Sequence, residues 1–350
     1  MKHIRILNLG TTNFSLPDPL EKPVEAATYN RLVTETATRI ELDGQYRALR
    51  EEAGFLARDR AALLVSGPDA AEYLQGQLTN DIEALEAEQG CYAALLDRKG
   101  HLASDLRVLR LENGDLWLDL EPAAADAVLK HLRTYSIGRE VEIADVTDRW
   151  AVISVIGPRA AELSGFDGLG PEHAQRFRQW EGADVLGVAT DGGVDLIVNA
   201  EDAATLENAL AAAGAVPVSE EAAEIVRVES GRPRFGLDMT SEHMPAEAGI
   251  VERAVDFEKG CYIGQEPVAR LHYRGKPNRS LRGLRLSAAA APGDALRLGE
   301  KEVGAIGTAC LSPAHGPIAL AIVRREAEIG EQLAVGDGAT AEVVELPFTT

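Results

Sequence analysis

The chain carries one pattern twice, in the same order, and this repeat constrains its fold more than any other feature. Residues 62–74 (ALLVSGPDAAEYL) resemble residues 152–163 (VISVIGPRAAEL): each is an apolar strand-like run, then Gly-Pro, then an Ala-rich helical start. Residues 116–129 and 194–206 form a second pair, each an alternating strand, a polar break and an amphipathic helix. The repeat predicts two similar α+β subdomains with largely antiparallel sheets and helices on one face. Coincidence in an Ala-rich sequence is the alternative.

The last seventy or so residues have a different hydrophobic pattern. From about residue 280, short alternating runs are separated by glycine or proline at intervals of about ten residues, which is typical of a small antiparallel barrel or sandwich. Residues 36–58 carry a helical pattern that we expect to pack on the first subdomain. The predicted organisation is a lead-in at 1–45, two α+β subdomains at about 46–145 and 146–278, and a C-terminal barrel at 279–350.

The charge of the chain limits its partners. The formal net charge is −21, so like charge disfavours bulk binding to nucleic acid. Between Arg270 and Arg285, however, six basic residues occur with no acid. This island is either a receptor for an anionic ligand or a solvated strand and linker with surface arginines.

The sequence also indicates a compartment. Cys91, Cys261 and Cys310 are far apart in the sequence and form no disulfide framework, which favours the reducing cytoplasm. No apolar run is long enough for a membrane helix, and the N-terminal stretch, broken by prolines and polar residues, does not have the pattern of a signal peptide. We therefore expect a cytoplasmic protein without a membrane partner.

The octapeptide Lys259–Glu266 (KGCYIGQE) fits no regular element, and we expect a shaped loop. Its Cys261 is the candidate reactive group, because a thiolate is the nucleophilic form of cysteine and the neighbouring Lys259 would lower the thiol pKa. A buried structural cysteine is the alternative. Gln265 and Glu266 have the donors and acceptors either to brace the loop or to hold a ligand.

Four segments together resemble one family. The octapeptide is similar to the signature of the YgfZ-like folate-binding proteins, which are relatives of the T-protein (aminomethyltransferase) of the glycine cleavage system. YLQGQLTNDIEAL (73–85), LLDRKGHLASDLRVLR (95–110) and GRPRFGLDMTSEHMPAEAGI (231–250) agree with it. The resemblance spans about residues 46–350. It implies an α+β fold of two ferredoxin-like subdomains and a C-terminal antiparallel β-barrel, arranged around a central opening that binds tetrahydrofolate.

The resemblance also implies a function. Family members assist the assembly or repair of iron–sulfur clusters in client proteins, which they contact transiently, and so affect tRNA modification indirectly. A folate-dependent aminomethyltransferase is the main alternative, and a client-binding scaffold without folate chemistry is another. A lone Cys261 cannot hold a cluster, since clusters generally need four ligands. The sequence contains no CxxC or HExxH pattern and supports no metal site.

Two aspartates are candidate folate contacts by the same resemblance. Asp105 stands where the T-protein has the second member of an acidic pair, but here the pair is Ser104-Asp105, which puts aminomethyl transfer in doubt. Asp191 stands loosely where a T-protein glutamate holds the pterin ring, although two glycines beside an aspartate also suit an ordinary hairpin. A strand-surface acid is the alternative for Asp105.

Arginines and aromatic residues complete the candidate site. Arg227, Arg232 and Arg234 have guanidinium groups that pair well with carboxylates such as the glutamyl tail of a folate, although surface or interdomain ion pairs are the alternative. Tyr262 and Phe235 are candidates to stack on a pterin ring or to lie in the core. Gln265 and Glu266 are, by the resemblance, candidates for the amide edge of the pteridine.

Overall fold

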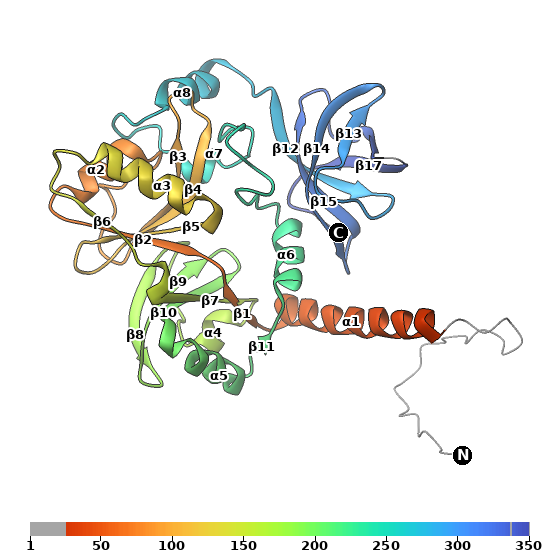
Figure 1. Cartoon of the computed structure of the whole chain (residues 1–350), viewed down its shortest axis with the longest axis horizontal. Helices are drawn as coiled ribbons and strands as arrows, with labels where there is room; N and C mark the ends of the chain where they lie inside the picture. Colours follow the sequence, from red (N-terminus) through yellow and green to blue (C-terminus); the bar gives the residue numbers. More distant parts are fainter. Residues whose placement is uncertain (1–25, 337, 350) are drawn as a thin grey trace, which may run out of the picture. The chain divides into compact units, whose positions relative to one another are not determined.

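The computed structural model describes residues 26–336 and 338–349 (Figure 1). The chain divides into two units, Met1–Glu41 and Leu42–Thr350, and helix α1 (Ala26–Glu51) begins in the first unit and ends in the second. The predicted lead-in at 1–45 falls partly on residues 1–25, which lie outside the described residues. Within the described part of the chain, no helix has both the length and the apolar character that crossing a bilayer requires.

The first repeat forms a five-stranded antiparallel sheet in the order β3-β4-β5-β2-β6. Helices α2 and α3 pack on one of its faces. Gly67 follows β2 and has a positive φ of 110°. Only glycine fits here, because a Cβ would lie 2.3 Å from the backbone oxygen of Glu140. The elements are β2 (Ala61–Ser66), α2 (Ala70–Gln77), β3 (Gly90–Leu96), β4 (Leu102–Arg110), β5 (Leu116–Leu120), α3 (Pro122–Tyr135) and β6 (Glu142–Asp145).

The second repeat has the same element order and the same sheet order, with one strand added. Its elements are β7 (Trp150–Ile156), α4 (Ala160–Ser164), β8 (Gln175–Trp180), β9 (Ala183–Thr190), β10 (Gly193–Asn199), α5 (Ala203–Ala213) and β11 (Val216–Pro217). The added strand, β1 (Gly54–Arg58), lies between β11 and β7. The predicted repeat is thus confirmed. The helix expected over 36–58 is wrong beyond Glu51, because the chain turns into β1, which belongs to the second sheet.

The two sheets pack against each other through the faces that their helices leave free. On β5, Leu118 and Leu120 face the helices of the first subdomain, whereas Trp117 lies in a cluster with Val152 and Ile197 of the second sheet. This two-residue alternation is what a strand buried on both faces requires. Each fully buried leucine or isoleucine contributes about 1.5–3 kcal/mol, so the inter-sheet layer holds the two subdomains firmly together.

The remaining elements connect the second sheet to a barrel. They are α6 (Glu220–Glu229), α7 (Val251–Ala254) and α8 (Gln265–Arg274), with Ser219 capping α6 by accepting a hydrogen bond from the Ala222 amide at 3.3 Å. The closed barrel runs β12-β15-β14-β13-β16-β17, with β12 (Arg279–Leu286), β13 (Ala295–Leu298), β14 (Lys301–Ser312), β15 (Gly316–Arg324), β16 (Gln332–Val335) and β17 (Ala339–Val344). The predicted α+β class and C-terminal barrel are confirmed.

Candidate functional site

At one end of the inter-sheet layer the two sheets open into a polar cavity of about 410 Å³, here called the inter-sheet cleft. Strands β4, β5, β7 and β10 supply its walls, and the end of α1, α6 and the segment after α6 supply its edge. Because side chains alternate along a strand, the residues that reach the cleft are spaced two apart. Examples are Asp105 and Arg107 on β4 and Ser154 and Ile156 on β7.

A buried ion network crosses the floor of the cleft. Arg107 pairs with Asp119, its cross-strand neighbour on β5, and with Asp195 of the second sheet at 2.8 Å. Arg60 binds Asp119 at 2.7 Å, and the Ser154 hydroxyl donates to Asp195 at 2.6 Å. Burial would raise the pKa of Asp119, but Arg60 and Arg107 hold it below its ordinary value. The network therefore keeps its charges and joins the two sheets.

Asp105 is a carboxylate in the cleft with one of its two oxygens unpaired among the described residues. The Tyr92 hydroxyl donates to its Oδ2 at 2.7 Å, whereas Oδ1 is buried and has no partner among the described residues. Burial raises the pKa of this carboxyl, although the hydrogen bond from Tyr92 and the charge of Arg60 act in the opposite direction. The neighbouring Ser104 hydroxyl donates to the backbone oxygen of Asp105 at 2.6 Å. An unpaired carboxylate oxygen beside a cavity is a ready acceptor for a ligand N–H.

Asp191 and Arg227 also line the cleft, but both already have partners. Asp191 pairs with Arg232 at 2.7 Å at the cleft edge, where the aspartate side chain is 42% exposed. The Arg227 guanidinium binds Glu224 at 2.8 Å and Asp238 at 2.7 Å, and it donates to the Thr308 hydroxyl of the barrel at 2.9 Å. Arg227 therefore joins α6 to the barrel, and it can take a ligand only by exchanging one of these bonds.

Arg234 and Phe235 are not among the residues that line the cleft. The Arg234 guanidinium binds Glu121 and Glu220, each at 3.0 Å, and so links α6 to the first subdomain. Phe235 packs against the buried clusters of the first sheet and of the octapeptide region. The structure thus brings Asp105, Asp191 and Arg227 together, but not Arg234.

The octapeptide lies against the C-terminal end of α2, and Lys259 holds it there. The Lys259 ammonium donates to the backbone oxygens of Gln75, Leu78 and Asn80 at 2.8, 2.7 and 2.6 Å, so it satisfies carbonyls at the C-terminal end of α2. Burial lowers the pKa of Lys259 to about 8. Its charge also lowers the pKa of Cys91, which burial nevertheless raises to about 12. Lys259 is therefore engaged in holding the loop in place.

The second half of the octapeptide begins a helix, so the predicted loop ends at Gly264. Gln265 and Glu266 form the first turn of α8. Gly264 has φ 83°, and a Cβ there would lie 2.5 Å from the Asp97 backbone oxygen, so only glycine fits. Cys261, in contrast, is exposed. The loop thus presents a thiol to solvent on a backbone that is fixed on both sides.

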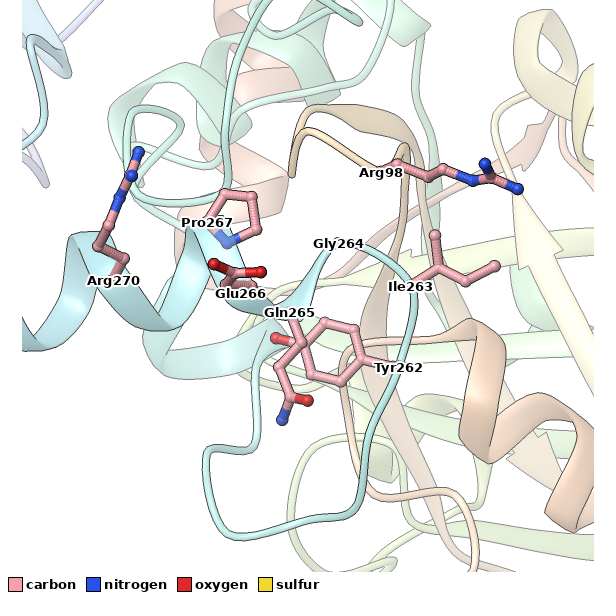
Figure 2. Close-up of a pocket in the computed structure, with 8 residues that line it drawn as sticks. All are labelled: Arg98, Tyr262, Ile263, Gly264, Gln265, Glu266, Pro267 and Arg270. Carbon is pink, nitrogen blue, oxygen red and sulfur yellow. The ribbon is translucent and has the colours of Figure 1, made fainter.

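A separate cavity of about 490 Å³ lies beside the start of α8 (Figure 2). Tyr262, Gln265 and Glu266 line it together with Arg98, from the β3–β4 hairpin, and Arg270 of α8. Tyr262 is 7% exposed and packs in the core cluster beneath the octapeptide. No octapeptide residue lines the inter-sheet cleft, so the candidate residues fall into two separate places.

Comparison with known proteins places the fold in a family. The profile of the GCVT N-terminal domain matches residues 26–259. An aminomethyltransferase from Exiguobacterium sibiricum is 31% identical over 354 residues, covering 97% of this chain and 96% of its own length. The chain belongs to the GCVT family. A second aminomethyltransferase, from Saccharopolyspora erythraea, is 31% identical and covers 87% of this chain and 89% of its own length.

A solved GCVT-family structure has the same fold. The glycine cleavage system aminomethyltransferase T from Bartonella henselae superposes with a TM-score of 0.77 at 22% identity, covering 88% of this chain and 89% of that one. The resemblance to the T-protein is therefore confirmed at the level of family and fold.

In this GCVT-family chain, several residues that line the cleft were not predicted from the sequence. His173 is buried at the cleft, and burial, followed by Arg107 and Arg253, lowers its pKa to about 3. Arg253 lies over the Tyr92 ring at 4.7 Å and pairs with Glu172 at 2.5 Å. Arg107 was detectable, because it shares the inward alternation of Asp105 in the strand LASDLRVLR. For His173 the sequence gives no comparable signal.

Proposed function

We propose that the inter-sheet cleft binds a reduced folate, tetrahydrofolate or a derivative. The supporting observation is the free Oδ1 of Asp105, a buried acceptor beside a cavity of about 410 Å³. A pterin ring offers N–H donors of the kind that such a carboxylate accepts. The cavity also lies in the size range usual for small-molecule sites. Membership of the GCVT family, with relatives named as aminomethyltransferases, agrees with a folate ligand.

The arginines at the edge of the cleft suit the other end of a folate. Arg50, Arg58 and Arg232 line it, and their side chains are 48%, 21% and 29% exposed. Partly exposed guanidinium groups bind carboxylates in a bidentate manner. We propose that the pterin lies inside, near Asp105, and that the glutamyl carboxylates lie at this edge, near Arg232.

Anaerobic titration calorimetry with tetrahydrofolate tests this assignment. Wild-type protein and the Asp105→Asn variant are compared with Asp126→Asn, which changes an exposed carboxylate on α3. We expect saturable binding in the wild type and in Asp126→Asn, and an affinity at least about tenfold lower in Asp105→Asn, because a charge-assisted hydrogen bond is lost. Equal affinities in all three proteins would contradict the assignment.

At a finer level, we propose that the chain is a YgfZ-like accessory protein for iron–sulfur client proteins in the cytoplasm, with indirect effects on tRNA modification. Two features support this role. Cys261 is exposed on a loop that Lys259 fixes, so it can contact a client. Ser104 in place of a carboxylate leaves Asp105 as the only acid of the pair, which argues against aminomethyl transfer. Tyr262, Gln265 and Glu266 support the loop in this proposal.

Aminomethyl transfer to the folate is the second candidate, because the full-length relatives of the chain are named as aminomethyltransferases. The two candidates are separated by supplying an aminomethylated lipoyl carrier with tetrahydrofolate and measuring methylene transfer. In parallel, the activity of an iron–sulfur enzyme is measured in cells that carry Cys261→Ser. Loss of client activity without transfer supports the accessory role. Transfer that survives Cys261→Ser, with client activity unchanged, supports the enzyme.

A further inference from the structure

The inter-sheet layer has a second opening at its other end, here called the apolar groove, with a volume of about 430 Å³. Its walls are the side chains of Trp117, Trp150, Phe177, Leu186 and Ile197. The Trp117 and Trp150 rings meet edge to face, with centroids 5.5 Å apart and planes at 87°. Phe177 is 54% exposed, although it is large and apolar. The groove shares no lining residue with the inter-sheet cleft, so the proposed folate site does not account for it.

Two buried polar atoms of groove-lining residues have no partner among the described residues. They are the indole Nε1 of Trp117 and the Oε1 of Gln175. Both residues are 4% exposed. The Gln175 amide nitrogen is already used, because it donates to the backbone oxygens of Gln89 and Arg110 at 2.9 and 3.2 Å. The wall therefore carries one unused donor and one unused acceptor, which a bound molecule with polar atoms can satisfy after a small adjustment.

The rim of the groove is acidic. Glu88, Glu112 and Asp184 line it and are exposed, and within residues 39–336 and 338–349 none of the three has an ion-pair partner. The lining includes no lysine, arginine or histidine. Asp184 accepts one hydrogen bond, from the Gln179 amide at 3.1 Å, and within the described residues its other oxygen has no hydrogen-bond donor. The groove thus joins an aromatic interior to an uncompensated negative rim.

We propose that the apolar groove is a binding site for a small organic cation with an aromatic or branched apolar body and an ammonium or guanidinium group. The apolar body fits against Trp117, Trp150 and Phe177, where burial of aromatic surface is favourable. The cation lies at the carboxylate rim, and cation–π attraction to the indoles adds to the charge attraction. An anion of the same shape is rejected by the rim, and the volume suits a molecule of this size.

Three probes with one skeleton test the charge preference: 4-phenylbutylamine, 4-phenylbutanol and 4-phenylbutyrate. None contains an indole, so the full-length chain reports through its own three tryptophans, whose ¹⁵N–¹H indole signals are assigned with Trp→Phe variants. We expect saturable shifts of the Trp117 and Trp150 signals with Trp180 unmoved. At low ionic strength the amine binds about tenfold tighter than the carboxylate, and high salt narrows this difference.

Charge variants sharpen the test. In the double variant Glu88→Gln/Asp184→Asn we expect the affinity for the amine to fall about fivefold, with the affinity for the alcohol unchanged. The matched control, Glu300→Gln/Glu331→Gln, removes two exposed carboxylates of the barrel and leaves all affinities unchanged. In Phe177→Ser we expect the affinity for all three probes to fall. Tighter or equal binding of the carboxylate, an equal effect of the control variant, or shifts that never saturate would each overturn the proposal.

Discussion

The inter-sheet cleft and the apolar groove are made by the same strands, yet one end of the layer is ionic and the other is aromatic. On β5, Trp117 faces the groove and Asp119 the cleft; on β10, Ile197 faces the groove and Asp195 the cleft. Each pair is two residues apart, so both members share a face of the sheet. A shift of two residues along a strand therefore changes the lining from aromatic or aliphatic to ionic. The polar end is stable because its charges pair with one another.

The largest effect is expected from breaking the pairing at the polar end. Arg107→Met leaves Asp195 with the Ser154 hydroxyl and Asp119 with Arg60. Removing one partner of a buried ion pair costs about 3–5 kcal/mol, and urea unfolding at neutral pH measures the loss. Arg139→Met, which removes an exposed pair with Glu72, is the control and leaves the free energy of unfolding essentially unchanged. An equal effect of the two variants would mean that the network does not join the sheets.

The apolar end is expected to contribute to stability but not to folate binding. Ile197→Ala removes buried methyl groups from the inter-sheet cluster and costs about 2–4 kcal/mol in the free energy of unfolding. Calorimetry with tetrahydrofolate on the same variant, below its unfolding temperature, should give the wild-type affinity. A parallel loss of affinity would show that the two ends are coupled rather than independent.

Acid should weaken the polar end selectively. The pKa of His173 is lowered to about 3, so the folded state binds fewer protons than the unfolded state between that value and the ordinary value of 6.5. Stability from this group is complete well above pH 6.5 and falls as the pH falls, by about 1.6 kcal/mol between pH 6.5 and 5. His173→Gln should abolish this part of the acid sensitivity in urea unfolding. The same loss in wild type and variant would place the sensitivity elsewhere.

The smallest effect in free energy, about 1.4 kcal/mol, corresponds to the tenfold loss of folate affinity expected in Asp105→Asn. The same variant should be more stable than the wild type at pH 7. Because burial raises the pKa of Asp105, the folded state binds more protons than the unfolded state, and the stability present at low pH declines as the pH rises through the two pKa values. A variant that loses both stability and affinity would indicate a structural role for Asp105.

The sequence predicted the repeat well because both copies contain the Gly-Pro break between strand and helix, which local backbone rules explain. It missed the strand Gly54–Arg58, which follows a helix directly and pairs with the second repeat rather than with its sequence neighbours. It found Asp105 through resemblance, but it did not predict that the octapeptide and the cleft have no lining residue in common. Such a separation depends on tertiary contacts such as the hold of Lys259 on Leu78.

The roles of the arginines also could not be predicted from the sequence. The sequence suggested Arg227 and Arg234 as ligands because guanidinium groups suit carboxylates, yet in the structure both bind carboxylates of the protein itself. The sequence cannot distinguish an arginine that is available to bind a ligand from one that forms ion pairs between two secondary-structure elements. The less engaged groups, such as Arg50 at the cleft edge, are identified only by their exposure and their long contacts.

A structure of the chain with tetrahydrofolate bound would locate the folate site. We predict that the pterin ring lies in the inter-sheet cleft, with a ring or amino nitrogen within hydrogen-bond distance of Asp105 Oδ1 and the glutamyl carboxylates near Arg232. A folate bound in the apolar groove or beside Tyr262 and Arg270, with the cleft unchanged, would contradict the assignment of the cleft as the folate site.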